Sequence, residues 1–368
     1  MKRAQIVKPY EPLVVDTVAI PEPPPKGVVV KTSYSGVCHT DLHQWDNEIS
    51  EGSNLVQFID NPDYKLPVVP GHEMSGIVHS VGSQQDQGDD PLKVGDRVAL
   101  YPWIGCGKCG FCNNGDSNIC AKNLWLGFML PGGYASYIIV PESKFAVKLP
   151  DSIPLDVACM FSCSGLTTYS AVVTARPAVE KAIVRKGKAN LLIIGAGGLG
   201  LWSTQIAKHL FKVSTIITVA DVNEEKLKVA RERGAHETVC WDPSVSDGNA
   251  IQEAMKIGGY DAIIDYVNTT KTTNRAFHCL GMGGLLVMVG LFGGQAQYSL
   301  PKMVFCGKGV QGVIVGTLQS MKDMIKLVAD EKLISPPMKY LKLEDVTETL
   351  KILREGKMTG RGVIDFNL

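Results

Sequence analysis

The sequence lacks an excess of either charge. Its 368 residues include 37 Lys and Arg and 37 Asp and Glu, which gives a formal net charge of zero, and like charges form no long run. A balanced surface offers no electrostatic footprint for nucleic acid or for an anionic membrane. We therefore expect no nucleic acid and no membrane as a partner, and a small neutral or mildly polar molecule as substrate.

The sequence also lacks an apolar segment long enough to cross a bilayer, and residues 1–9 do not resemble a secretory signal. We expect a cytoplasmic protein. In a reducing compartment, ten cysteines are better explained as metal ligands and core residues than as disulfides. Four cysteines stand alone and are interpreted as ordinary buried thiols, namely Cys159, Cys240, Cys279 and Cys306.

Two regions of different pattern follow one another, and the length suits about two domains. Up to about residue 160, short β-branched runs alternate with turns, which predicts a mostly antiparallel β domain. From Asn190 onward, apolar runs at 191–194, 215–220, 237–241, 260–267 and 285–290 alternate with helical stretches at 199–211, 223–233, 249–257 and 272–280. This alternation predicts an α/β domain with a doubly wound parallel sheet.

A glycine-rich turn lies between the first of these strands and the first helix. Its residues are Gly195, Ala196, Gly197, Gly198, Leu199 and Gly200. In this context GxGxxG predicts a dinucleotide site, because it lets the backbone approach a pyrophosphate at the helix N-terminus. Asp221 ends the next strand, where a carboxylate bonds ribose hydroxyls and repels a 2′-phosphate, so we favour NAD over NADP. Lys226 either approaches the same ribose or is a solvated helix residue.

Four cysteines in one short segment form the second motif, Cys106, Cys109, Cys112 and Cys120. Their thiolates can close tetrahedrally on one zinc ion with no open position, which is typical of a structural site. An iron–sulfur cluster is the alternative, but the bacterial ferredoxin pattern has a different last spacing followed by proline. We expect the metal to fold a lobe that has little core of its own.

Three further residues of the zinc-ligand type lie far apart in the sequence: Cys38, His72 and Cys163. Two thiolates and one imidazole leave a fourth zinc position open for water or a substrate oxygen, as in a catalytic site. Zinc lowers the pKa of bound water to about 7, and a bound alcohol should respond in the same way. The set therefore predicts oxidation of an alcohol, with hydride passing from a zinc-bound alkoxide to the nicotinamide.

Together these motifs resemble a zinc-dependent alcohol dehydrogenase of the medium-chain dehydrogenase/reductase superfamily, and the similarity covers nearly the whole chain. The landmarks in order are GVCHTDLH from Gly36, GHE from Gly71, VGDRV from Val94, the four cysteines, CSGLTTYSA from Cys163, GAGGLG from Gly195 and GRG from Gly360. The resemblance implies two zinc ions per chain, one catalytic and one structural, and a primary or secondary alcohol as substrate with an aldehyde or ketone as product.

The resemblance also implies roles for residues around the catalytic zinc. Glu73 would sit beside the metal and exchange as a ligand, and Asp41 would orient the imidazole of His72. Thr40 would hydrogen-bond the substrate oxygen and pass its proton through the cofactor ribose to His43.

Four more residues would contact the cofactor by the same resemblance. His39 and Arg361 would lie near the pyrophosphate, and Thr167 and Val289 near the nicotinamide. A purely structural role is the alternative for each of them.

The family architecture implies a discontinuous catalytic domain. A GroES-like, mostly β catalytic domain would comprise residues 1–164 and 313–368, and a Rossmann NAD-binding domain residues 165–312, with the substrate in the cleft between them. Members form homodimers or homotetramers, so we expect a homo-oligomer.

One departure from the family concerns the segment from Gln44 to Gly71, which is longer than the usual connection. It could form a lid, recognise a larger alcohol, contact a neighbouring subunit, or be an inert insertion.

Three other functions are open. A polyol or sugar-alcohol dehydrogenase commonly has a carboxylate in place of Cys163, and Asp221 disfavours an NADPH-dependent aldehyde reductase of the cinnamyl-alcohol type. A non-catalytic, crystallin-like nucleotide-binding protein would need neither Thr40 nor His43.

Overall fold

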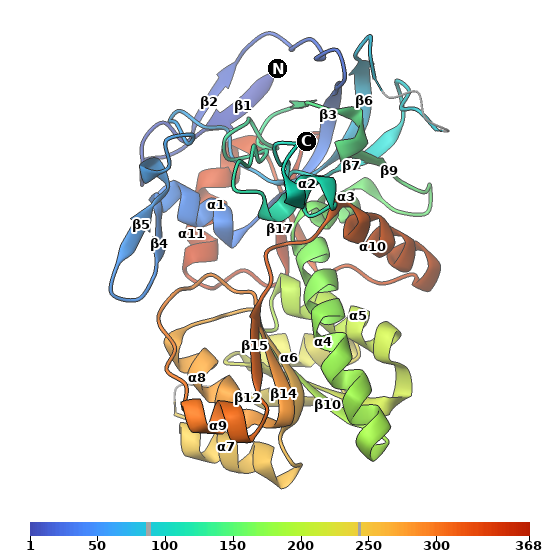
Figure 1. Ribbon diagram of the computed structural model, residues 1–368. Helices are drawn as coiled ribbons and strands as arrows, with labels where there is room; N and C mark the ends of the chain where they lie inside the picture. The colour runs from blue at the N-terminus through green and yellow to red at the C-terminus, as the bar shows by residue number, and fades with distance from the viewer. Residues whose placement is uncertain (86–89, 242–243) are drawn as a thin grey trace.

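The computed structural model describes residues 1–85, 90–241 and 244–368 and contains two large sheets (Figure 1). The first sheet is built from both ends of the chain. Its strand order is β16-β17-β3-β6-β7-β9, with β8 also paired to β3, and every pair except β16–β17 is antiparallel. The strands are β3 (Val28–Val37), β6 (Glu73–Val81), β7 (Arg97–Leu100), β8 (Tyr137–Val140), β9 (Ala146–Lys148), β16 (Met338–Leu341) and β17 (Arg361–Asp365).

Short elements surround this sheet. The strands are β1 (Lys2–Gln5), β2 (Val14–Thr17), β4 (Glu48–Ser50) and β5 (Leu55–Gln57), which pair as two hairpins. The helices are α1 (His39–Asp46), α2 (Gly110–Asn113), α3 (Leu155–Ala158) and α11 (Val346–Arg354). The 3₁₀ turns are η1 (Phe58–Asp60), η2 (Ser117–Ile119), η3 (Ser143–Phe145), η4 (Cys159–Ser162) and η6 (Leu343–Asp345).

The second sheet has six strands, all parallel, in the order β12-β11-β10-β13-β14-β15. Its strands are β10 (Ala189–Ile194), β11 (Thr215–Asp221), β12 (Glu237–Cys240), β13 (Tyr260–Asp265), β14 (Leu280–Met288) and β15 (Gly309–Gly312). Its helices are α4 (Ser164–Lys186), α5 (Gly198–Phe211), α6 (Glu224–Glu232), α7 (Asp247–Lys256), α8 (Thr270–Cys279) and α9 (Leu300–Phe305), with η5 (Lys212–Ser214) after α5.

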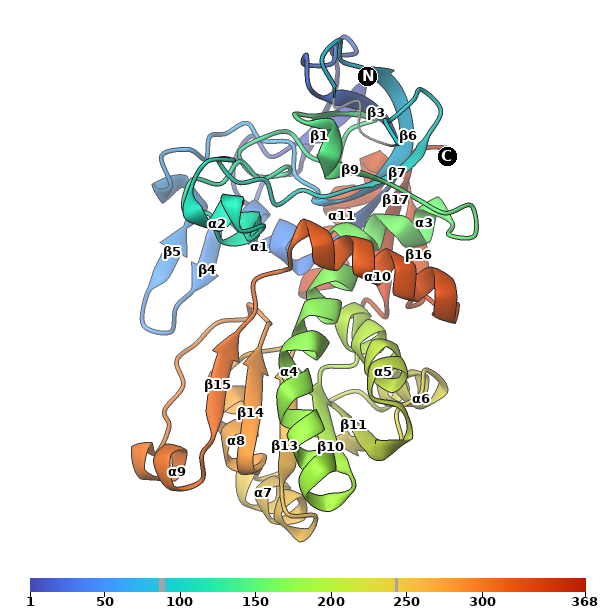
Figure 2. The same cartoon turned by 45° about the vertical axis from the view of Figure 1, so that its right-hand side comes forward.

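Helices cover both faces of the parallel sheet. Helix α4 packs on α5, α7 packs on α8, and the two pairs lie on opposite sides (Figure 2). Strands β10 and β13 are buried along their whole length, as expected for central strands of a sheet that helices cover on both faces. The predicted combination of a mostly antiparallel β part and a doubly wound parallel sheet is confirmed.

The chain passes between the two sheets twice. It crosses first between η4 and α4, at Cys163, and returns between β15 and α10 (Leu318–Glu331), through residues 313–317. These passages lie close to the predicted domain limits at 164/165 and 312/313, which stay a prediction. The glycine turn and the metal-type residues come from elements next to the two passages.

Within the described ranges, no single helix is long and apolar enough to cross a membrane. Only a broken pair passes that test of length and composition, Leu155–Ser162 with Ser164–Lys186, and it is bent by 56°.

Candidate active site

The glycine turn joins β10 to α5 with the geometry that its glycines require. Gly195 has φ +97°, in the left-handed region, and a Cβ on Gly200 would lie 1.7 Å from the carbonyl oxygen of Gly195. Around Gly197 a Cβ would meet nothing within 4 Å, so the backbone there borders open space. The turn therefore offers an exposed backbone at the N-terminus of α5, as a pyrophosphate site needs.

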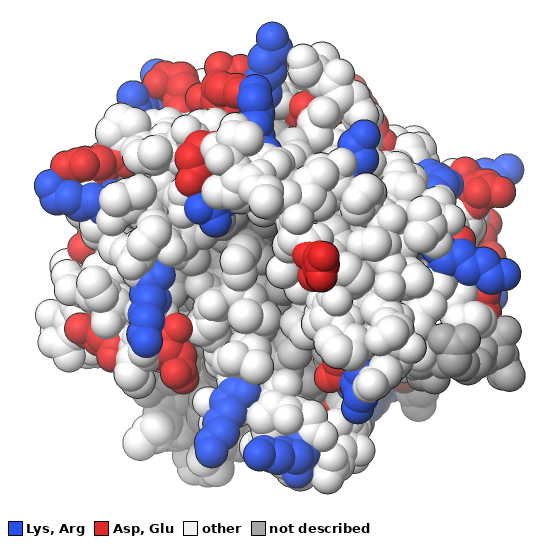
Figure 3. All heavy atoms as spheres, turned by 90° about the horizontal axis from the view of Figure 1, so that it is seen from above, with Lys and Arg blue, Asp and Glu red and all other residues white. Residues whose placement is uncertain are grey.

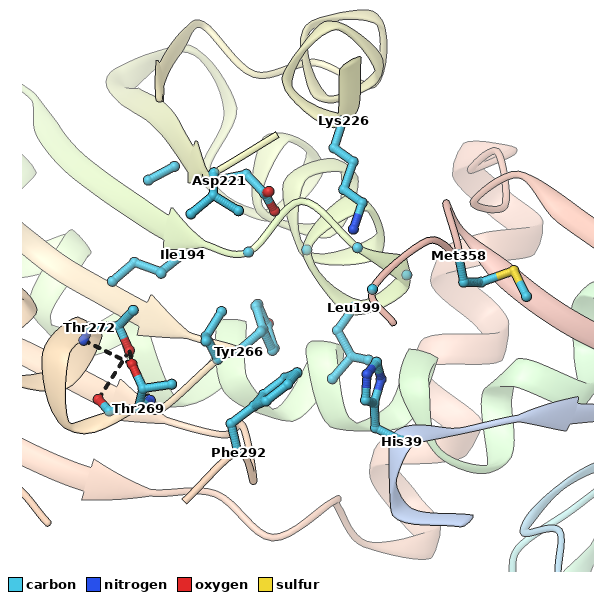
Figure 4. Close-up of a pocket in the computed structure, with 18 of the residues that line it drawn as sticks. His39, Ile194, Leu199, Asp221, Lys226, Tyr266, Thr269, Thr272, Phe292 and Met358 are labelled. Atoms are coloured by element: carbon cyan, nitrogen blue, oxygen red, sulfur yellow. Dashed lines mark hydrogen bonds between the residues drawn. The ribbon is translucent and has the colours of Figure 1, made fainter. Parts of the chain in front are cut away.

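Asp221, at the end of β11, is fixed beside this turn. Its Oδ2 accepts a hydrogen bond from Ala196 N at 2.6 Å, and its Oδ1 accepts one from Asn223 N at 2.9 Å. Figure 4 shows Lys226 reaching toward the turn from α6, on the same side as Asp221. The two side chains bring opposite charges to one edge of the pocket.

A pocket of about 420 Å³ runs along the turn and into the cleft between the two sheets (Figure 4). Predicted residues among those lining it are His39, Gly195, Gly197, Gly198, Leu199, Gly200, Asp221, Lys226 and Arg361. The sequence analysis missed other lining residues, including Trp241, Arg275 and Phe292. Trp241 and Phe292 come shortly after the ends of β12 and β14, which was their only signal in the sequence, whereas Arg275 lies inside α8 and had none.

The three separated metal-type residues come together in the fold. Cys38, His72 and Cys163 are buried, and their ligand atoms lie within 4.8 Å of one another. The His72 Nε2 atom is buried without a hydrogen-bond partner in the described structure. A buried imidazole nitrogen facing two thiols is the donor set that zinc prefers, so these residues fit the predicted metal.

Asp41 holds this cluster in place from α1. Its Oδ1 lies 3.0 Å from His72 Nδ1, so Nε2 is left for the metal. Burial opposes the charged imidazole, but the Asp41 carboxylate outweighs it and raises the pKa of His72 to about 10. A metal binding at Nε2 therefore has to displace a proton.

The two thiols of this cluster differ. The hydrogen bond from Cys163 lowers the pKa of Cys38 well below its usual range, and the same contact raises the pKa of Cys163. The positive charge of Arg361 also favours the Cys38 thiolate.

Glu73 and Arg361, both predicted site residues, form a buried ion pair. Arg361 Nε donates to Glu73 Oε2 at 2.7 Å, and a second bond from Nη2 reaches Oε1, which also accepts from Ser164 N at 2.8 Å. Glu73 lies outside the three-residue cluster. The exchange of Glu73 onto the metal stays a prediction, and so does the contact of Arg361 with a phosphate. Either contact would require at least one hydrogen bond of this ion pair to break.

The remaining residues of α1 lie around the cluster. The Thr40 hydroxyl is 3.7 Å from Cys38 Sγ, and His43 is half-buried on the same face of the helix, three residues later. Burial lowers the pKa of His43, and it lowers the pKa of His39 to about 4. The His39 ring lies 5.2 Å from that of Phe292, centroid to centroid, inside the pocket.

Two predicted nicotinamide contacts are placed elsewhere than on the pocket lining. Thr167 is buried in the first turn of α4, and its backbone N–H donates to Cys163 O at 2.8 Å. Val289 follows β14, and its N–H donates to Asp265 O at 3.0 Å. Both roles stay predictions.

The four-cysteine segment folds as a separate lobe around α2 and η2. The sulfur atoms of Cys106, Cys109, Cys112 and Cys120 lie within 4.8 Å of one another. Backbone N–H groups of Lys108 and Cys109 lower the pKa of Cys106 to about 6, while burial raises that of Cys112 to about 11. Four converging thiols with no open side fit a closed structural zinc site.

Charges on the face seen in Figure 3 are mixed in sign. Lysines and arginines alternate with aspartates and glutamates around the edge, and uncharged residues occupy most of the centre. That face presents no basic stripe.

Comparisons with known proteins agree with this geometry. Residues 24–151 match a family described as "Alcohol dehydrogenase GroES-like domain", and residues 198–330 match "Zinc-binding dehydrogenase". The chain is 33% identical to an NAD-dependent alcohol dehydrogenase of Saccharolobus solfataricus over 366 residues, which cover 99% of both chains. It is also 33% identical to an alcohol dehydrogenase of Geobacillus stearothermophilus, with coverage of 99% of this chain and 98% of that one.

Two solved structures have a similar fold. The alcohol dehydrogenase of Aeropyrum pernix superposes with a TM-score of 0.82 at 27% identity, covering 99% of this chain and 100% of that one. The D-arabinose dehydrogenase of Sulfolobus solfataricus superposes with a TM-score of 0.81 at 26% identity, covering 99% and 98%.

Proposed function

Because the chain belongs to the zinc-dependent alcohol dehydrogenases of the medium-chain dehydrogenase/reductase superfamily, we propose that it interconverts a primary or secondary alcohol and its aldehyde or ketone with NAD. One observation carries this proposal. Val37 and His39 line the nucleotide pocket, and Cys38 between them belongs to the metal-type cluster. The backbone of β3 and α1 therefore places the metal ligands directly against the cofactor pocket.

Each cofactor has a matching set of residues. Cys38, His72 and Cys163 would hold the catalytic zinc, and the four-cysteine lobe would hold the structural zinc. When bound, zinc supplies Lewis acidity that makes a substrate hydroxyl more acidic, and NAD supplies the hydride acceptor. The three ligands leave room for one substrate oxygen.

Residues of α1 would handle the proton. The Thr40 hydroxyl lies beside Cys38 and can accept a hydrogen bond from a substrate hydroxyl. His43, whose pKa burial lowers, is neutral near pH 7 and can take the proton onward to solvent. His39 is neutral as well and packs against Phe292 at the cofactor.

Asp221 supports NAD rather than NADP. Its carboxylate is fixed by two backbone N–H groups at the turn, where a ribose would lie. A 2′-phosphate there would be repelled by this fixed negative charge, and the positive charge of Lys226 would offset only part of that repulsion.

A sugar or polyol substrate is the second candidate, and the structural similarity to a D-arabinose dehydrogenase favours it. Cys163 as third ligand and the complete four-cysteine lobe support the alcohol instead.

We also propose a homo-oligomer, either a dimer or a tetramer. Strand β15 ends the parallel sheet, and in the described structure it pairs only with β14. Next to it, α9 exposes Leu300, Val304 and Phe305, at 72%, 75% and 81% of their surface. An open strand edge beside exposed apolar side chains is a surface that a second copy would cover.

A cytoplasmic location stays a prediction from the sequence.

The deciding experiment follows reduced nicotinamide by its near-ultraviolet absorbance, with NAD or NADP and a panel of short, long-chain, aromatic and sugar alcohols. We expect chelator-sensitive reduction of NAD. The variant Cys38→Ser should lower kcat/KM by about 1,000-fold or more, because metal polarisation contributes several kcal/mol. Cys306→Ser, which changes a cysteine outside both clusters, is the matched control. Fully metallated protein that reduces neither cofactor with any alcohol would refute the proposal.

A further inference from the structure

The return passage between the two sheets has an unusual backbone. Residues 313–317 connect β15 to α10, and Val315 in their middle has φ +51°, in the left-handed region. A β-branched residue rarely adopts this conformation, so the surrounding structure has to hold it. Val315 is also buried, at 8% exposure.

Two side chains hold this passage on either side of Val315. The Tyr101 hydroxyl donates to Gly316 O at 2.8 Å, and Asn118 Nδ2 donates to Ile314 O at 2.8 Å. Tyr101 is completely buried, and Asn118 is 8% exposed. The two carbonyl groups flanking the strained residue are thus fixed from the first domain.

The outward passage is held by the same segment. Trp103 Nε1 donates to Ser162 O at 2.7 Å, one residue before Cys163. Ser117 Oγ donates to Trp103 O at 3.2 Å and lies 3.4 Å from the Tyr101 hydroxyl. Residues 101–118 therefore hydrogen-bond to both chain passages between the two sheets.

The position of Asn118 depends on the four-cysteine lobe. It lies in η2, two residues before Cys120, and the lobe exposes its larger apolar residues, with Phe111 at 51% and Ile119 at 44%. A lobe with so little core needs its metal to keep η2 in place.

We infer that residues 101–120, which include the four-cysteine lobe, clamp both interdomain passages, and that Tyr101 and Asn118 are positioning residues that set how firmly the two domains hold NAD. This inference rests on the proposed function, because it assumes that NAD binds in the pocket between the two sheets. Clamped passages reduce the conformational freedom that the domains would otherwise lose when they close on the cofactor.

The test compares Tyr101→Phe/Asn118→Asp with Asn113→Asp, which makes the same amide-to-acid change on an exposed residue of the lobe. In ligand-free protein, amide hydrogen exchange of residues 313–317 should rise in the double variant and not in the control. The Kd for NADH, from fluorescence titration, should rise about 3- to 10-fold, the loss expected from one or two hydrogen bonds. Cys109→Ser should bind one zinc ion fewer, which metal analysis would check. It should also raise both the exchange of residues 313–317 and the Kd for NADH.

A folded double variant with wild-type exchange at 313–317 and a Kd within twofold of wild type would overturn the inference. If the double variant does not fold, Tyr101→Phe alone decides, because it removes only the hydroxyl that reaches Gly316 O. Failure of the wild-type protein to bind NADH would refute the proposed function instead. The exchange measurement needs no NADH and would still decide whether residues 101–120 hold the return passage.

Discussion

Asp41 hydrogen-bonds to two of the three metal-type residues, the imidazole of His72 and the backbone N–H of Cys38. Its two carboxylate oxygens accept hydrogen bonds from four groups, His72 Nδ1, Gly71 N, Cys38 N and the Tyr134 hydroxyl. In Asp41→Asn one oxygen becomes a donor, so at least one of these buried donors loses its acceptor.

We expect Asp41→Asn to lower the zinc affinity of the three-residue cluster by about 10- to 100-fold. Competition with a chromophoric chelator measures this affinity. The exposed Asp63→Asn is the control, and it should leave both zinc ions bound. Equal affinities in the two variants would show that Asp41 does not orient His72.

A second prediction for a single residue concerns Asp221, which we expect to set the cofactor preference. Asp221→Ser would remove the charge expected to face the ribose and would leave Lys226 in the pocket lining. We expect the KM for NAD to rise by about 10- to 100-fold, the loss of hydrogen bonds to a charged group, and the KM for NADP to fall. Glu224→Ser, which removes a neighbouring exposed charge, is the control. An unchanged ratio of the two KM values would contradict the assignment.

At the scale of elements, the long segment from Gln44 to Gly71 contains the β4–β5 hairpin, and the hairpin contacts the other domain. Gln295 Nε2 donates to Glu51 O at 3.3 Å and lies 3.4 Å from Ser53 Oγ. Gly52 has φ +90°, and a Cβ there would lie 2.3 Å from Gln295 Cγ.

Gly52→Ala should therefore separate the hairpin tip from the loop that carries Gln295. Both the left-handed backbone and the missing space oppose the added methyl group. We expect faster hydrogen exchange in residues 48–57. Gly248→Ala, on α7 where a Cβ fits, should leave that exchange unchanged. Equal exchange in both variants would mean that the hairpin does not depend on this contact.

Other elements show which parts of the fold the sequence could predict. The glycine turn and the alternating strands were predicted correctly, because apolar runs and glycine positions are local properties. No element was predicted where α4 lies, since β-branched residues and Pro177 lower its helix propensity, and packing against α5 overrides this. Strand β15 was also not predicted, because Gly309–Gly312 contains only one β-branched residue and so lacks the usual pattern of a strand.

The site shows the same limit. The metal-type residues were identified by residue type and local motif, and the fold brought them together. The pairing of Glu73 with Arg361 joins residues 288 positions apart, and no local pattern predicts such a contact. The proposed roles of both residues now have to include this ion pair.

At the scale of the whole molecule, the proposed oligomer is expected to use the β15 edge of the parallel sheet. Strand β15 and the exposed face of α9 lie together at the end of this sheet (Figure 1). Phe305, the single aromatic residue of α9, is 81% exposed. A charged side chain at this position would cost several kcal/mol if an interface buried it, and almost nothing if it stayed in solvent.

Phe305→Glu should therefore lower the molecular mass in solution toward that of a single chain. Light scattering after size-exclusion chromatography measures the mass. Val184→Glu, at an 87% exposed position on α4, is the matched control and should keep the assembly of the wild type. If both variants keep the wild-type mass, the subunits meet elsewhere, and the open edge of β15 has to be protected in another way, because unpaired strand edges promote aggregation.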